Sequence, residues 1–154
     1  MQIVPILGKV KFPITLDPSS WIFDDRKIAY QDFYDKAFDL DDFLEAQKDE
    51  RAGAAIPRLA KQKRKYKKEE WLTESFVIPF KIFLENAEVL PDAKEILFER
   101  VNGEQVAIPL NEAAKSVLQF SSEGRLLSED GPLIYLSHDP SQPPVTQITK
   151  ITVI

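Results

Sequence analysis

The sequence contains no cysteine, and it has only one histidine and one methionine. A chain without cysteine forms no disulfide and offers no thiolate for redox chemistry or for binding a soft metal ion. Its apolar runs are a few residues long, far below the ~20 residues that cross a bilayer, so we expect no membrane insertion. The start of the chain also lacks the basic and apolar regions of a secretory signal. Because missing cysteine fits a reducing compartment, we predict a cytoplasmic protein.

Basic residues are in deficit as well. The chain carries 20 Lys and Arg against 25 Asp and Glu, a net charge of −5, whereas a dedicated nucleic-acid binder usually has a basic excess. It also lacks the nucleophile-elbow, P-loop, dinucleotide-binding and HExxH motifs. With 44% apolar and 29% charged residues, the composition is that of a soluble globular protein. We expect residues 1–154 to form a single domain.

The first part of the chain predicts strands followed by a helical segment. Apolar and polar residues alternate over residues 10–16, the pattern of a half-buried strand. Residues 21–23 are apolar and predict a second strand. Apolar residues then recur at helical spacing over residues 31–52. Asp39 or Asp41 can cap a break that divides this segment into two shorter helices.

The second part predicts a sheet with short helices. The expected elements are a helix at 80–87 and strands at 95–101, 104–110, 117–120, 133–136 and 145–154. Asn102-Gly103 predicts a type I′ hairpin turn, which needs positive φ at both residues. Asn111 is expected to cap a helical turn. These patterns predict an α+β fold with a mixed, mostly antiparallel sheet and short helices.

Four short motifs follow one another in this part of the chain. They are Ile78-Pro79-Phe80, Ile108-Pro109-Leu110, Gly131-Pro132-Leu133 and Ile148-Thr149-Lys150-Ile151-Thr152-Val153. Their order resembles the molybdopterin-binding domain of sulfite-oxidase-type oxidoreductases, and the resemblance covers residues 78–154, about half of the chain. It implies a sulfite-oxidase-like scaffold of a helix, a hairpin with a short helix, and two closing strands.

The departures from that family concern its active centre. The resemblance implies a cysteine thiolate that ligates molybdenum upstream of the first motif, and residues 20–75 contain no cysteine. It also implies an arginine after the third motif, where this chain has Ile134. Because function depends on the site and not on the fold, the resemblance implies the scaffold without the redox activity. We therefore expect a non-redox protein without a cofactor.

Aromatic and charged residues near the start of the chain form a candidate interaction surface. Trp21 and Tyr34 flank Asp24 and Arg26. Interfaces are enriched in aromatic residues and arginine. These four residues therefore predict a surface that binds a protein or a peptide.

A basic run is the second candidate surface. Its members are Arg58, Lys61, Lys63, Arg64, Lys65, Lys67 and Lys68. Such a run can bind nucleic acid, anionic lipid or an acidic partner, but Tyr66 alone offers a ring on which a base could stack. A solvated segment, or one that complements the acidic residues of 32–50, is the favoured interpretation. We expect residues 52–70 to be a mobile basic loop or a loosely attached helix.

Two further groups invite a chemical interpretation. Ser137-His138-Asp139 has the residue types of a catalytic triad, but neighbours on an extended chain project apart, so we expect an exposed loop histidine. The cluster Asp39, Asp41, Asp42 and Glu45 could hold calcium. It lacks the spacing and glycine of an EF-hand loop, and a solvated helix face is favoured.

Three hypotheses of function follow from these features. The first is a cofactor-free binding or interaction module on the molybdopterin-binding-like scaffold. The second is an enzyme, for example a prolyl isomerase, that uses carboxylates and Arg26 in a cleft. The third is a weak nucleic-acid binder through residues 58–68. A pocket with convergent side chains of perturbed pKa favours the enzyme, whereas a flat apolar patch favours the module.

Overall fold

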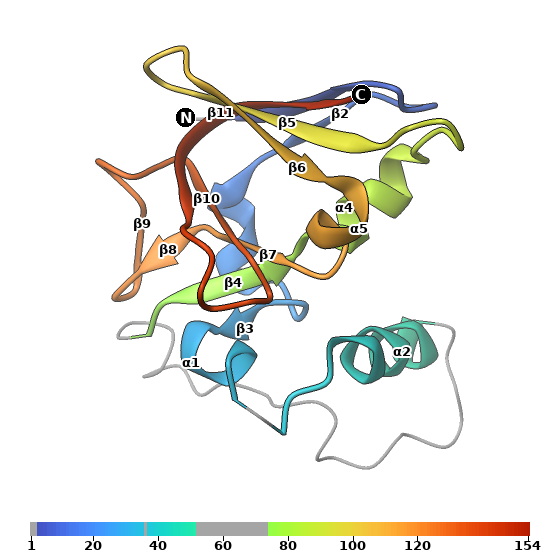
Figure 1. The fold of residues 1–154 in the computed structure, drawn as a ribbon. Helices are drawn as coiled ribbons and strands as arrows, with labels where there is room; N and C mark the ends of the chain where they lie inside the picture. The colour runs from blue at the N-terminus through green and yellow to red at the C-terminus, as the bar shows by residue number, and fades with distance from the viewer. Residues whose placement is uncertain (1–2, 36, 52–73) are drawn as a thin grey trace.

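A curled, mostly antiparallel sheet forms the centre of the fold in the computed structural model, which describes residues 3–35, 37–51 and 74–154 (Figure 1). Its strands are β1 (Val4–Gly8), β2 (Ile14–Leu16), β3 (Ile28–Ala29), β4 (Phe76–Pro79), β5 (Glu95–Arg100), β6 (Gln105–Pro109), β7 (Val117–Gln119), β10 (Leu133–Leu136) and β11 (Val145–Val153). The order is β2-β1-β11-β10-β7-β4-β3, and β5 and β6 branch from β11. The predicted mobile segment 52–70, with its basic run, lies outside the described residues.

Short helices and one small hairpin complete the described fold. The helices are the 3-10 helix η1 (Pro18–Phe23) and the α-helices α1 (Tyr30–Phe33), α2 (Leu40–Arg51), α4 (Phe80–Ala87) and α5 (Leu110–Ala113). The hairpin joins β8 (Ser121–Ser122) to β9 (Arg125–Leu126). Within the described sheet, β1 and β11 are parallel and the other paired strands are antiparallel. The α+β class with a mixed, mostly antiparallel sheet is therefore confirmed.

Strand β11 is the branch point of the sheet. It bends at Gln147, whose φ is 57°. Val145 and Ile148, on the two sides of the bend, pair with β10. Ile148 and the residues after it pair with β5, and the last of them, Ile151 to Val153, also pair with β1. The N–H of Val101, just after β5, donates to the carbonyl of Gln147 at 2.9 Å. Because β11 changes direction at this bend and pairs with both β10 and β5, the β5–β6 hairpin turns away from β10 (Figure 1).

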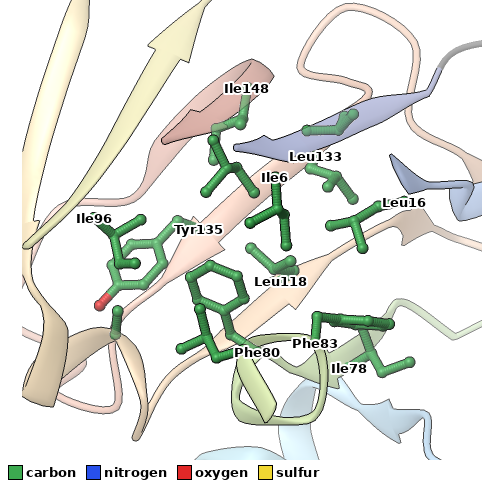
Figure 2. Packing of buried hydrophobic residues seen from close by; sticks show 14 of the residues in the cluster. Ile6, Leu16, Ile78, Phe80, Phe83, Ile96, Leu118, Leu133, Tyr135 and Ile148 are labelled. Carbon is green, nitrogen blue, oxygen red and sulfur yellow. The ribbon is translucent and has the colours of Figure 1, made fainter. Parts of the chain in front are cut away.

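The central strands are buried on both faces. Side chains alternate along a strand, so Leu133 and Tyr135 of β10 enter one apolar cluster while Ile134 and Leu136 enter another. Figure 2 shows Tyr135 in the larger cluster together with Phe80 of α4. Such strands have no polar face, which explains their continuous apolar sequence.

Aromatic side chains from the α1 and α2 region close the second cluster. Phe33, Phe38 and Phe43 follow one another with ring centroids 5.9 Å apart at each step. The helix predicted over residues 31–52 is divided into α1 and α2. The carboxylate of Asp39 accepts a hydrogen bond from the N–H of Asp42 at 3.1 Å, at the start of α2. The expected break, capped at Asp39, is thereby confirmed.

The predicted strand at 21–23 is wrong, because this segment belongs to η1. Pro18 occupies the first turn, where a fixed φ favours a helix, and the carboxylate of Asp17 accepts from the N–H of Ser19 at 3.1 Å. The strand expected over residues 10–16 is shorter than predicted. It begins at Ile14, after Pro13, and Val10 makes an isolated bridge to Val89.

The hairpin between β5 and β6 forms where predicted, with a different turn. Asn102 does not have the positive φ that a type I′ turn requires, whereas Gly103 has φ of 87°. The N–H of Gly103 donates to the carbonyl of Arg100 at 2.9 Å. The N–H of Arg100 donates to the carbonyl of Glu104 at 2.8 Å. This is a three-residue loop with glycine in the left-handed position. The expected cap at Asn111 is also wrong, because Pro109 is the N-cap of α5.

Candidate functional site

A hollow of about 540 Å³ lies between β6 and the loop that joins β10 to β11. Val106 and Ile108 of β6 line one side, and Pro144 and Val145 line the other. Val106 and Ile108 are half-buried because they pair with the buried residues of β5 and share their inward face. The volume falls in the range typical of ligand sites, and the wall formed by these four residues is apolar.

One end of the hollow holds a histidine and a glutamate. Nε2 of His138 lies 2.9 Å from Oε2 of Glu112, which joins the loop after β10 to helix α5. Both side chains are partly open to solvent, with 36% and 41% of their surface exposed. A carboxylate at this distance fixes the orientation of the imidazole ring.

The buried hydroxyl of Ser116 supports this end from below. It accepts hydrogen bonds from the hydroxyl of Tyr135 at 3.0 Å and from the N–H of His138 at 3.2 Å, and it donates to the carbonyl of Glu112 at 2.8 Å. Burial raises the pKa of the Tyr135 hydroxyl, so this group stays a neutral donor. The backbone on which His138 and Glu112 sit is therefore fixed by one buried group.

Arg100 forms the opposite end. Its Nε donates to the carbonyl of Thr146 at 3.0 Å, and its second terminal nitrogen donates to Oγ1 of Thr146 and Oε1 of Gln147 at 3.1 and 3.2 Å. The first terminal nitrogen lies 3.3 Å from Oε2 of Glu104. These bonds occupy the guanidinium and tie the hairpin to β11, so Arg100 holds the shape of the hollow.

The sequence pattern pointed to His138 as a candidate residue but did not indicate its partner, Glu112. The structure confirms an exposed loop histidine and shows no triad among the three neighbours. Oγ of Ser137 accepts from the N–H of Asp139 at 3.1 Å, while the carboxylate of Asp139 binds the side chain and N–H of Ser141. Those bonds to Ser141 lower the pKa of Asp139. Glu112 is 26 residues away from His138, and no motif connects the two in the sequence.

The predicted interaction surface does not form as expected. Trp21 is 4% exposed and stacks on Phe83 in the core. Arg26 and Asp24 form an ion pair at 2.6 Å, with 15% of each side chain exposed, and the guanidinium lies over the ring of Phe83. A large aromatic ring gains more from packing in the core than from remaining on the surface, so Trp21 is not an exposed anchor.

Tyr34 lies apart from that group. Its hydroxyl donates to the carbonyl of Ser137 at 2.8 Å, and burial raises its pKa to about 12. It borders a second hollow of about 650 Å³ that also reaches His138. Tyr34 therefore connects the α1 region to the loop of the first hollow.

The acidic cluster lies on helix α2 and at its start. Asp41, Asp42 and Glu45 are exposed, as expected for a solvated face, and Asp39 caps the helix. Within the described parts of the chain, no three His, Asp or Glu side chains are grouped as metal ligands. None of the described helices is long and apolar enough to cross a membrane.

The comparisons with known proteins give one kind of match. No family model matches the chain, and no curated protein matches it. Among solved structures, the crystal structure of the sulfane dehydrogenase SoxCD from Paracoccus pantotrophus is similar, with a TM-score of 0.55 and 14% sequence identity. The match covers 99% of this chain and 38% of that chain. It shows a distant likeness of fold and does not extend to activity.

The residues present do not fit the molybdenum cofactor that the resemblance implies. The chain has no cysteine to supply the thiolate ligand. At the position of the implied arginine, Ile134 is 7% exposed and packs in the apolar cluster with Ile28 and Val77. An apolar cluster cannot satisfy the charges of a pterin phosphate.

Proposed function

We propose that this chain is a cofactor-free, non-redox binding module, acting in the cytoplasm, whose ligand site is the hollow between β6 and the β10–β11 loop. The observation that carries the proposal is the hollow itself, which combines an apolar wall of Val106, Ile108 and Val145 with polar groups at both ends. Ligand sites usually have this composition, because apolar surface supplies affinity and a few polar groups supply orientation.

The polar groups are better suited to holding a ligand than to a covalent step. Arg100 is engaged by three residues, and the hydroxyl of Ser116 is buried and bonded on all sides. Among the described residues, the imidazole of His138 has Glu112 as its side-chain partner and no hydroxyl nucleophile. A Ser or Thr nucleophile would need such a bond to a base.

One observation favours an enzyme as the second candidate. An imidazole oriented by a carboxylate at the edge of a hollow is the usual form of a general base. In that case the His138–Glu112 pair would act on a bound substrate, and a prolyl isomerase remains one example of such an enzyme. The two candidates share the site and differ in whether the ligand is converted.

A fragment screen separates them. The probe is a library of small polar and aromatic fragments added to isotope-labelled protein, with amide shifts as the readout. We expect shifts at Ile108, His138 and Val145, and we expect their loss in Pro144→Trp, which fills the mouth of the hollow from an exposed position. Pro91→Trp is the control, because Pro91 is also exposed and lies outside the hollow.

Two results would overturn the proposal. Fragments that shift residues elsewhere and leave the hollow unchanged would remove the site. Conversion of a fragment, or catalysed isomerisation of a proline peptide, that is lost in His138→Gln would replace the binding module by an enzyme.

A further inference from the structure

The outer edge of β6 is open for pairing. Within the described residues, β6 pairs with β5 alone. The bond from the N–H of Arg100 to the carbonyl of Glu104 fixes the register, and inward-bonded and outward-directed residues alternate along an antiparallel strand. The N–H and C=O groups of Gln105 and Ala107 are therefore directed away from β5.

Neighbouring bonds agree with this assignment. The N–H of Leu110 donates to the carbonyl of Lys94 at 2.9 Å, which continues the inward-bonded series at the other end of the hairpin. Pro109 lies one residue earlier, in an outward position where its missing N–H costs no bond to β5. An open edge that borders a hollow can accept an added strand.

The charge around the hollow selects the chemistry of that strand. Glu104, Glu112 and Asp139 carry negative charge there, and Arg100 is the described lysine or arginine that lines it. Arg100 is already paired with Glu104 at 3.3 Å. Glu112 has His138 and Asp139 has Ser141 as a side-chain partner, and no described lysine or arginine is paired with either carboxylate. Their negative charge therefore sets the local field, which attracts a cationic group.

We propose that the hollow binds an extended, basic peptide segment, which adds to the edge of β6 and directs lysine or arginine side chains towards Glu112 and Asp139. This inference rests on the proposed function and names its ligand class. Main-chain bonds to Gln105 and Ala107 supply the alignment, and the carboxylates supply the selectivity.

Binding of synthetic peptides tests the chemistry of the ligand. The parent probe is a short capped peptide of alternating lysine and threonine, and its match has glutamate in place of lysine. We expect the lysine peptide to bind roughly tenfold or more tightly, because like charges repel the glutamate peptide. Glu112→Gln should weaken the lysine peptide by about fivefold, the upper value for a solvent-exposed pair. Glu129→Gln, an exposed change outside the hollow, should not.

Removal of N–H groups tests the mode of binding. Two further peptides carry N-methyl groups on every lysine or on every threonine. Alternate N–H groups of a strand point to opposite edges, so one of these peptides should lose binding and the other should keep it. On the protein, Ala107→Pro removes an outward N–H and should abolish binding, whereas Ala107→Thr keeps that N–H and should not.

The outcomes distinguish this inference from the proposed function. Equal affinity for lysine and glutamate peptides overturns the basic ligand. Equal affinity for the parent and both methylated peptides overturns strand addition. If no peptide binds while fragments still shift the hollow, the peptide inference falls and the proposed function stands. If neither binds, both fall.

Discussion

Trp21 stacks on Phe83 with ring centroids 4.9 Å apart and an angle of 19° between the rings. Phe120 packs against the same indole in a T-shaped arrangement, with ring centroids 5.4 Å apart. Through this contact, one side chain of the 3-10 helix η1 is inserted between helix α4 and the end of strand β7. The stack therefore anchors a segment that has little regular structure of its own.

We expect Trp21→Ala to lower the free energy of unfolding by about 3–5 kcal/mol, because it removes a large buried side chain and leaves a cavity. Phe23→Ala is the matched control in the same helix, since Phe23 is 74% exposed, and its effect should stay below about 1 kcal/mol. Urea denaturation measures both. A Trp21→Ala protein as stable as the wild type would contradict the burial of Trp21 in the core.

Two glycines with similar backbone angles should respond differently to alanine. Gly8 and Gly103 have φ of 93° and 87°. A Cβ on Gly103 meets no atom within 4 Å, whereas a Cβ on Gly8 overlaps the carbonyl oxygen of Val153. We expect Gly103→Ala to cost about 1–2 kcal/mol from strain alone, and Gly8→Ala to cost about 3 kcal/mol or more. Equal costs in thermal unfolding would contradict the close approach of β1 to β11.

Local sequence patterns were sufficient for some elements and not for others. Helix α4 has apolar residues at helical spacing over two turns, and its predicted bounds match the structure. Residues 21–23 show no hydrophobic period. The signal that decides their structure is Asp17 and Pro18, which begin the 3-10 helix. The hairpin was predictable from Asn102-Gly103, but its loop length was not, because one glycine serves several turn types.

The site was much less accessible from sequence. Ser116 joins Tyr135 and His138, which lie 19 and 22 residues away, and Arg100 reaches Thr146 over 46 residues. Contacts of this kind depend on how strands distant in sequence are paired, β7 with β10 and β5 with β11, and leave no local pattern. Composition marked Trp21 as an interface residue, yet the same aromatic character favours burial when a matching cavity exists.

Tyr34 should make stability depend on pH in the alkaline range. Its pKa is raised from 10.0 to about 12, mainly by burial. The folded state therefore keeps the proton more tightly, so the stability from this group is present below pH 10 and is lost as the pH rises to about 12. In Tyr34→Phe the decline of the unfolding free energy over this range should be smaller. An unchanged decline would show that another group causes it.

The last prediction compares two ion pairs of similar length. The carboxylate of Asp24 lies 2.6 Å from Arg26, and that of Asp92 lies 2.7 Å from Lys9. The side chains of the first pair are 15% exposed, while those of Lys9 and Asp92 are 45% and 68% exposed. Asp24 also accepts from both Nε and the backbone N–H of Arg26. Burial and geometry, and not distance, should therefore decide the contribution of each pair.

We expect Arg26→Ala to lower the free energy of unfolding by about 2–4 kcal/mol, because it leaves the carboxylate of Asp24 poorly solvated and removes the cation over Phe83. Lys9→Ala should leave the urea midpoint almost unchanged, since water solvates Asp92 on its own. Added salt should reduce the small effect of Lys9→Ala and leave that of Arg26→Ala intact, because buried pairs are little screened. If Arg26 were part of an exposed binding surface, both variants would be equally mild and equally sensitive to salt.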